Sequence, residues 1–209
     1  MDIGEISSGR TERVLVDPDE LRPSVEDVTR CAAGPDYEPR DAIRSAIERM
    51  LAGSVLGHIQ PVYCFAIYPV TGPGPGGLQL GAGPDVELAL PAGQAPPAAL
   101  AAAVCTVGEV DERLEGLIES QGPLDAWIGQ GIALAQLEIL ERLCTSHILR
   151  LAESAGARTE DYVEPEVGTR SQQDLFAVLD RKLVPVRLTQ YGTMQPRMSY
   201  SFWLPLRPG

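Results

Sequence analysis

The spacing of apolar residues along the chain predicts several helices. After Pro39, apolar residues recur every three or four positions, which predicts an amphipathic helix that ends at Gly53 or Gly57. The same spacing predicts a helix over residues 109–122 and a long helix over residues 124–155. Shorter helices are expected over the small residues 97–103 and over residues 172–180.

Strands are predicted where β-branched and aromatic residues gather or alternate with polar ones. These segments are residues 14–16, 61–68, 78–80, 86–90, 104–107, 183–189 and 198–204. We expect the last two to pair as antiparallel strands, and the glycine-rich run 71–77 to be a loop. Because helices and hairpin-like strands cluster instead of alternating, the pattern predicts an α+β fold with antiparallel pairing. Since no linker divides the chain, residues 1–209 are expected to form one domain, with a flexible segment over residues 1–13.

Two glycines inside the long predicted helix call for a structural reason. Gly129 and Gly131 each cost about 1 kcal/mol relative to alanine in a helix interior. We therefore expect this part of the helix to pack closely against a neighbouring element.

The charge balance excludes some classes of partner. With 17 Lys and Arg against 29 Asp and Glu, the 209-residue chain carries a formal charge of −12, which argues against nucleic-acid binding. The longest mostly apolar stretch, residues 98–108, is too short to span a membrane, and the start of the chain has no signal-peptide pattern. A soluble cytoplasmic protein is expected.

Few side chains form a recognisable chemical motif. The four cysteines are widely separated and have no CxxC pair, so we expect buried thiols and no metal site. Glu138 and Glu141 share one face of the long helix, where they either face solvent or line a site. Glu164 and its acidic neighbours are interpreted as solvated loop charges. No catalytic triad or nucleophile elbow is present in this reading of the sequence.

Four segments carry a more specific resemblance. They are Val104–Gly108 with Val110–Arg113, Leu124–Gly129 with Ala135–Glu138, Gln172–Asp180, and Val186–Ser201. In this order they resemble segments of the activation domain of cobalamin-dependent methionine synthase, and the likeness extends from about Val14 to Leu206. The resemblance implies a twisted antiparallel sheet with flanking helices and a groove that holds S-adenosylmethionine.

The resemblance also implies candidate site residues and a partner. In the family, this domain docks over the cobalamin domain and supplies a methyl group after cob(II)alamin has been reduced by a flavoprotein. Glu138 falls on the family's ligand-contacting helix glutamate, and its carboxylate could offset the sulfonium charge of the ligand. Arg158 matches a family arginine, and the implied ligand set is completed by Tyr162, Thr189 and Tyr191.

This chain departs from the family pattern at two places. The family's Pro-Gly-Tyr turn is missing from residues 158–168, and Gln190 and Tyr191 replace the Glu and Ser of its LTES motif. The chain also has no Asp-x-His-x-x-Gly signature, so a corrinoid would come with a partner protein.

Three functions are compatible with these observations. The first is an S-adenosylmethionine-binding accessory protein that helps to reactivate a corrinoid-dependent methyltransferase in trans. The second is a repurposed small-molecule enzyme on the same fold, with an altered pocket built from the same polar set. The third is a docking module or homo-oligomer subunit whose acidic surface steers a basic partner.

Overall fold

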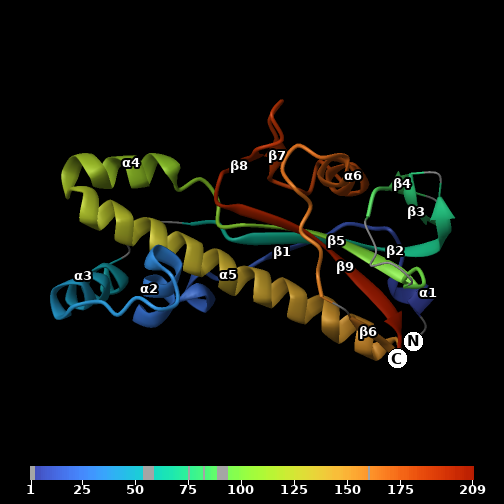
Figure 1. Cartoon of the computed structure of the whole chain (residues 1–209), viewed down its shortest axis with the longest axis horizontal. Helices are drawn as coiled ribbons and strands as arrows, with labels where there is room; N and C mark the ends of the chain where they lie inside the picture. Colours follow the sequence, from blue (N-terminus) through green and yellow to red (C-terminus); the bar gives the residue numbers. More distant parts are fainter. Residues whose placement is uncertain (1–2, 54–58, 75, 82, 89–93, 160) are drawn as a thin grey trace.

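The main sheet is antiparallel throughout and is crossed on one side by a single long helix (Figure 1). The computed structural model describes residues 3–53, 59–74, 76–81, 83–88, 94–159 and 161–209. The seven strands follow the order β4-β3-β2-β5-β9-β6, with β1 paired to β2. Their bounds are β1 Glu12–Leu15, β2 Val62–Gly74, β3 Gly77–Leu80, β4 Asp85–Val86, β5 Ala99–Thr106, β6 Ala157–Thr159 and β9 Ser199–Pro208.

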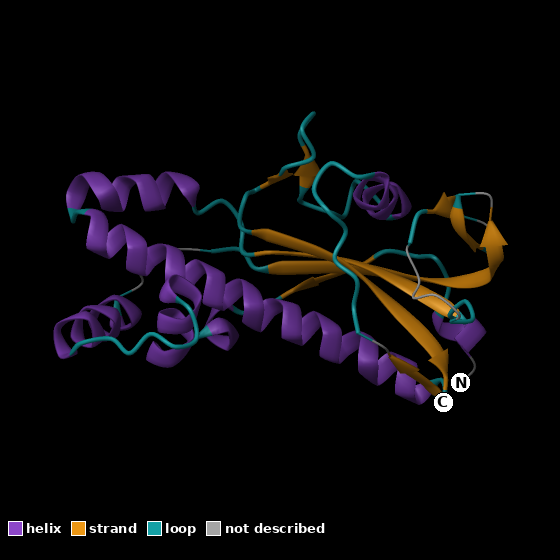
Figure 2. Cartoon of the chain, viewed as in Figure 1, coloured by secondary structure: helices purple, strands orange, loops and turns teal. Residues whose placement is uncertain are grey.

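Helices lie on both faces of this sheet, as Figure 2 shows. The long helix α5 Pro123–Ser154 covers one face, and α4 Asp111–Ser120 leads into it. The same side carries α1 Ile3–Ile6, the 3-10 turn η1 Pro18–Leu21, α2 Val25–Ala33 and α3 Asp41–Ala52. The opposite face carries α6 Arg170–Val178 and the two-stranded sheet of β7 Arg187–Leu188 and β8 Met194–Gln195 (Figure 1).

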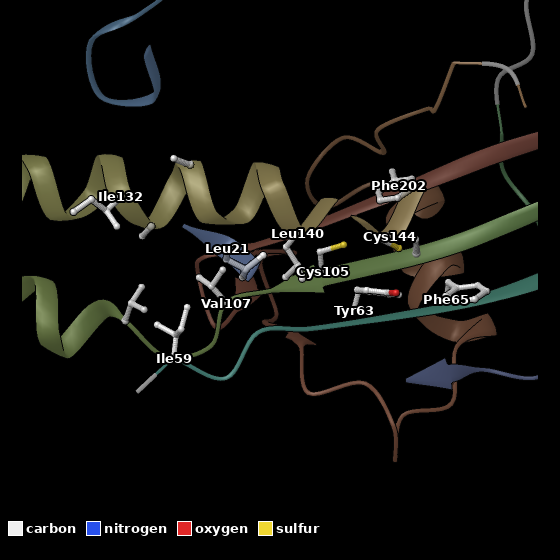
Figure 3. Close-up of a cluster of buried hydrophobic side chains, with 14 of the residues drawn as sticks. Leu21, Ile59, Tyr63, Phe65, Cys105, Val107, Ile132, Leu140, Cys144 and Phe202 are labelled. Atoms are coloured by element: carbon white, nitrogen blue, oxygen red, sulfur yellow. The ribbon is translucent and has the colours of Figure 1, made fainter. Parts of the chain in front are cut away.

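The alternation of side chains along each strand divides the core into two layers. On β9, Phe202 and Leu204 pack toward α5, whereas Trp203 packs toward α6. Figure 3 shows the α5 layer, where Leu140 and Cys144 of α5 meet Cys105 of β5. We call these two faces of the sheet the α5 side and the α6 side.

The glycines of α5 confirm the expected close packing. A Cβ atom on Gly131 would lie 2.8 Å from the Cβ of Ala32 and 3.0 Å from the carbonyl oxygen of Val28. A Cβ atom on Gly129 would lie 2.8 Å from a methyl group of Leu117. The two glycines therefore allow α2 and α4 to approach α5.

The small-residue helix predicted over residues 97–103 is wrong. Ala99–Thr106 form β5, which lies between β2 and β9 and is buried along its whole length. A strand that is buried on both faces has no alternation of polar and apolar positions, so periodicity cannot separate it from a buried helix.

Three further predictions about the strands and their connections differ from the structure. Residues 183–189 do not pair with residues 198–204: Leu188 pairs with Met194 in a short hairpin, and β9 pairs with β5 and β6. The hairpin closes after two residues on each strand, which frees the following segment to enter the main sheet. The glycine-rich run 71–77 is largely strand, because β2 continues to Gly74 and β3 begins at Gly77. The predicted strand over 86–90 keeps only Val86 within β4, and residues 89 and 90 lie outside the described residues.

The N-terminal part of the chain is more structured than expected. Ser24 and Asp27 form a capping box that begins α2, a helix absent from the sequence interpretation. Within residues 1–13, the structure describes α1 and the start of β1 and buries Ser7 and Thr11. The hydroxyl of Thr11 accepts a hydrogen bond of 2.8 Å from the backbone N–H of Asp180. Among the described residues, no helix is both long and apolar enough to cross a membrane.

Candidate ligand-binding site

Glu138 lies in the middle of α5 and forms an ion pair with Arg30 of α2. The Arg30 Nη1 and Nη2 atoms donate to the two carboxylate oxygens at 3.0 and 2.6 Å. This fork-on-fork contact lowers the pKa of Glu138, so its carboxylate is charged at neutral pH. The pair is partly exposed, with 42% of the Arg30 side chain and 44% of the Glu138 side chain accessible to solvent.

Glu141 lies three residues further along the same face of α5. Its side chain is only partly accessible, and burial raises the pKa of its carboxyl group. The carboxylates of Glu138 and Glu164 raise this pKa further, whereas a hydrogen bond of 3.2 Å from the hydroxyl of Thr145 lowers it. Three acidic side chains therefore influence one another at this position.

The segment 161–168 supplies the opposite side of the site. Val163 pairs with Trp203 of β9 through two backbone hydrogen bonds of 2.8 and 2.9 Å. Since Val163 packs with Trp203 on the α6 side, alternation turns the residues before and after it toward the α5 side. The ring of Tyr162 accordingly lies 5.4 Å from the ring of Phe202 and 6.2 Å from that of Tyr200.

The hydroxyl group of Tyr200 is buried beside these residues. No partner among the described residues meets hydrogen-bond geometry with its oxygen atom. Burial raises the pKa of Tyr200, and the nearby Glu164 carboxylate and Tyr162 hydroxyl raise it further. Tyr200 therefore remains a neutral phenol whose buried hydroxyl group faces Glu164 and Tyr162.

We call Glu138, Glu141, Tyr162, Glu164 and Tyr200 the acid–aromatic cluster. It combines three carboxylates with two phenol rings on the α5 side of β9, a set suited to an organic cation. Among the described residues, no group of three or more His, Cys, Asp and Glu side chains is arranged to hold a metal ion.

The structure brings together only two of the five residues that the resemblance implies. Glu138 and Tyr162 both belong to the acid–aromatic cluster. Arg158 of β6 pairs with Arg207 of β9, and Leu206, the residue before Arg207, packs on the α5 side. The side chain of Arg158 thus lies on the α6 side, away from Glu138.

Thr189 and Tyr191 lie in the turn between β7 and β8. The N–H of Gly192 donates to the carbonyl of Thr189 at 3.0 Å, and Tyr191 is 77% exposed. The turn packs against the end of the 161–168 segment, because a Cβ atom on Gly192 would lie 2.4 Å from the backbone nitrogen of Gly168. These two residues therefore do not join Glu138.

Sequence reasoning missed two members of the cluster. The sequence indicates a solvated loop charge at Glu164, and it places Tyr200 only within the Val186–Ser201 segment of the resemblance. Alternation along the last strand could have placed Tyr200 on the same face as Phe202, but only the Val163–Trp203 pairing shows that Glu164 turns toward it.

Comparison with known proteins gives a match at the level of structure. The sequence matches no protein-family model and no curated protein. The structure resembles the crystal structure of the MetH reactivation domain bound to AdoHcy, with a TM-score of 0.66, 12% sequence identity, and coverage of 95% of this chain and 78% of that chain. The fold is that of the MetH reactivation domain. The α+β architecture with an antiparallel sheet and flanking helices, predicted from the sequence, is confirmed.

Proposed function

We propose that this chain binds S-adenosylmethionine at the acid–aromatic cluster and assists the reductive reactivation of a corrinoid-dependent methyltransferase in trans. The observation that carries the proposal is the likeness to the MetH reactivation domain over 95% of the chain. That domain was crystallised with AdoHcy, the product left when S-adenosylmethionine gives up its methyl group.

The chemistry of the cluster suits the charge of this ligand. S-adenosylmethionine carries a sulfonium and an ammonium group, and both are attracted by carboxylates and by the faces of aromatic rings. Glu138 and Glu141 present two carboxylates on one helix face, and Glu164 adds a third from the facing segment.

Each member of the cluster has a distinct role in this proposal. Glu138 and Glu141 offset the positive charge of the ligand, and Tyr162 offers a ring face from the opposite wall. The buried phenol of Tyr200 packs against Tyr162 and faces Glu164, so it supports this wall of the site. The ligand in turn supplies a methyl group to the reduced corrinoid of the partner protein.

A single-pocket enzyme built from Glu138, Arg158, Tyr162, Thr189 and Tyr191 is less well supported. Such an enzyme needs these side chains in one site, and the structure distributes them over both sides of the sheet.

A reactivation assay tests the proposed function. A corrinoid methyltransferase in its cob(II)alamin state is mixed with S-adenosylmethionine and titanium(III) citrate, and return of the methylated corrinoid is followed by absorbance. We expect this chain to increase the rate, the double variant Glu138→Gln/Glu141→Gln to lose most of the increase, and the control Glu153→Gln on the exposed part of α5 to keep it. Equal rates with and without the folded chain would contradict the proposal.

A further inference from the structure

A groove of about 1150 Å³ lies on the α6 side of the sheet, away from the acid–aromatic cluster. Its walls are α6 and the segment that leads into β7, and its apolar lining includes Phe176, Leu179, Val184 and Leu188. A second groove of about 450 Å³ shares Glu109, Pro185 and Pro196 with the first, so the two are continuous. We call the combined space the α6 groove. It is large enough for a ligand of drug or nucleotide size.

The charged residues of the α6 groove are mostly positive, in contrast to the rest of the chain. Arg181 and Arg187 line the first part, and Arg13 and Arg113 line the second. Four of the 17 basic residues thus border one groove in a chain of net charge −12.

The two acidic residues of the lining do not balance these arginines. Asp174 is already engaged, since it accepts a hydrogen bond of 2.8 Å from the backbone N–H of Glu87 and pairs with Arg170 at 3.5 Å. Glu109 is the other acid. Among the described residues, neither Arg181 nor Arg187 has an ion-pair partner within 4.0 Å. Their guanidinium groups are therefore available to an anion.

We propose that the α6 groove binds a small organic anion, one with an apolar, ring-sized body and a phosphate, sulfonate or carboxylate group. The apolar lining takes the body, and Arg181 and Arg187 take the anionic group, for which a planar guanidinium fork is well suited. This site is independent of the proposed S-adenosylmethionine site because β5 and β9 lie between the two (Figure 1).

A pair of fluorescent probes tests both parts of the proposal. 1-Anilinonaphthalene-8-sulfonate has the anionic group, and N-phenyl-1-naphthylamine has the same rings without it. We expect the folded chain to bind the sulfonate at least tenfold more tightly than the neutral probe. The double variant Arg181→Gln/Arg187→Gln should lose this preference but keep binding of the neutral probe, which also shows that it remains folded.

The matched control removes two arginines elsewhere. Arg22→Gln/Arg40→Gln changes two exposed residues that do not line the α6 groove. Sulfonate binding by this variant should therefore stay within twofold of the unmodified chain. Binding of S-adenosylmethionine should be unchanged in both double variants, which separates this site from the proposed function. Equal affinity for the two probes, or equal loss in both double variants, would overturn the proposal.

Discussion

Arg30 holds Glu138 in a bidentate ion pair that links α2 to α5 across 108 residues of sequence. The contact is partly exposed, and pairs of this kind contribute about 0–1 kcal/mol to stability. Its greater consequence is electrostatic, because Arg30 offsets the negative charge of Glu138 before any ligand binds. A cation that binds at Glu138 must share the carboxylate with Arg30.

Two substitutions in this pair should change ligand affinity in opposite directions. Glu138→Gln removes the charge that attracts the sulfonium, so affinity for S-adenosylmethionine should fall about tenfold. Arg30→Gln leaves Glu138 uncompensated, so affinity should rise severalfold. Calorimetric titration measures both, with Arg22→Gln as a control that breaks an exposed ion pair elsewhere. A loss of affinity in Arg30→Gln would show that Arg30 itself contacts the ligand.

Glu141 should make stability depend on pH. Burial raises its pKa in the folded state above the ordinary value of 4.5, so the folded chain holds a proton that the unfolded chain has already lost. The free energy of unfolding therefore falls as pH rises through this window, and at neutral pH the buried charge destabilises the protein. Glu141→Gln keeps an oxygen that can accept from Thr145 and should raise the melting temperature at pH 7 by about 2 °C.

The pH profile of that variant separates charge from packing. Below pH 4.5 the Glu141 carboxyl group is protonated and therefore neutral, like the amide of the Gln variant. The difference in melting temperature between the unmodified chain and the variant should then disappear. The control Glu153→Gln should match the unmodified chain at every pH. A lower melting temperature for Glu141→Gln at pH 7 would mean that its charge is stabilised by a contact of another kind.

Close packing at Gly131 should outweigh helix propensity. Gly131→Ala places a Cβ atom 3.0 Å from the Val28 carbonyl oxygen and 2.8 Å from the Ala32 Cβ, so overpacking should lower the free energy of unfolding by about 1–3 kcal/mol. Gly116→Ala on α4 meets no atom within 4 Å and should gain about 0.5–1 kcal/mol from propensity. Chemical denaturation measures the free energy of unfolding of both variants. A higher value than that of the unmodified chain in both would show that α2 moves to make room for the Cβ atom at position 131.

The thiols should react slowly in the folded protein. Burial raises the pKa of Cys31 to about 11 and that of Cys64 to about 12, and it raises the pKa of Cys105 well above its ordinary value. With Ellman's reagent at pH 8, we expect less than one thiol to react within minutes in the native chain and four after unfolding. Cys31→Ser should remove most of the native signal, because the other three cysteines are buried. Rapid reaction of two thiols would contradict the packing around β5.

The three longer helices are predictable from the spacing of their apolar residues. This spacing predicts α3, α4 and α5, and Gly131 indicates a close helix contact. The same method failed for β5, where burial on both faces removes the periodic signal. It also missed α2, whose beginning is set by the capping box at Ser24.

The site was less predictable because it depends on pairing between distant segments. Helix spacing alone places Glu138 beside Glu141. The position of Tyr162 depends on a backbone pairing between residues 163 and 203 that leaves no pattern in the sequence. The register of β6 against β9 likewise decides that Arg158 lies on the α6 side.

The most direct test of the central claim compares S-adenosylmethionine with S-adenosylhomocysteine by calorimetry. The two ligands differ by one methyl group and by the positive charge on sulfur, which is the feature that the acid–aromatic cluster is proposed to recognise. We predict that the unmodified chain binds S-adenosylmethionine about tenfold more tightly, a difference of about 1.4 kcal/mol, and that Glu138→Gln/Glu141→Gln reduces the preference to within twofold. Tighter or equal binding of S-adenosylhomocysteine by the unmodified chain, or no heat from either ligand at millimolar concentration with the protein folded, would contradict it.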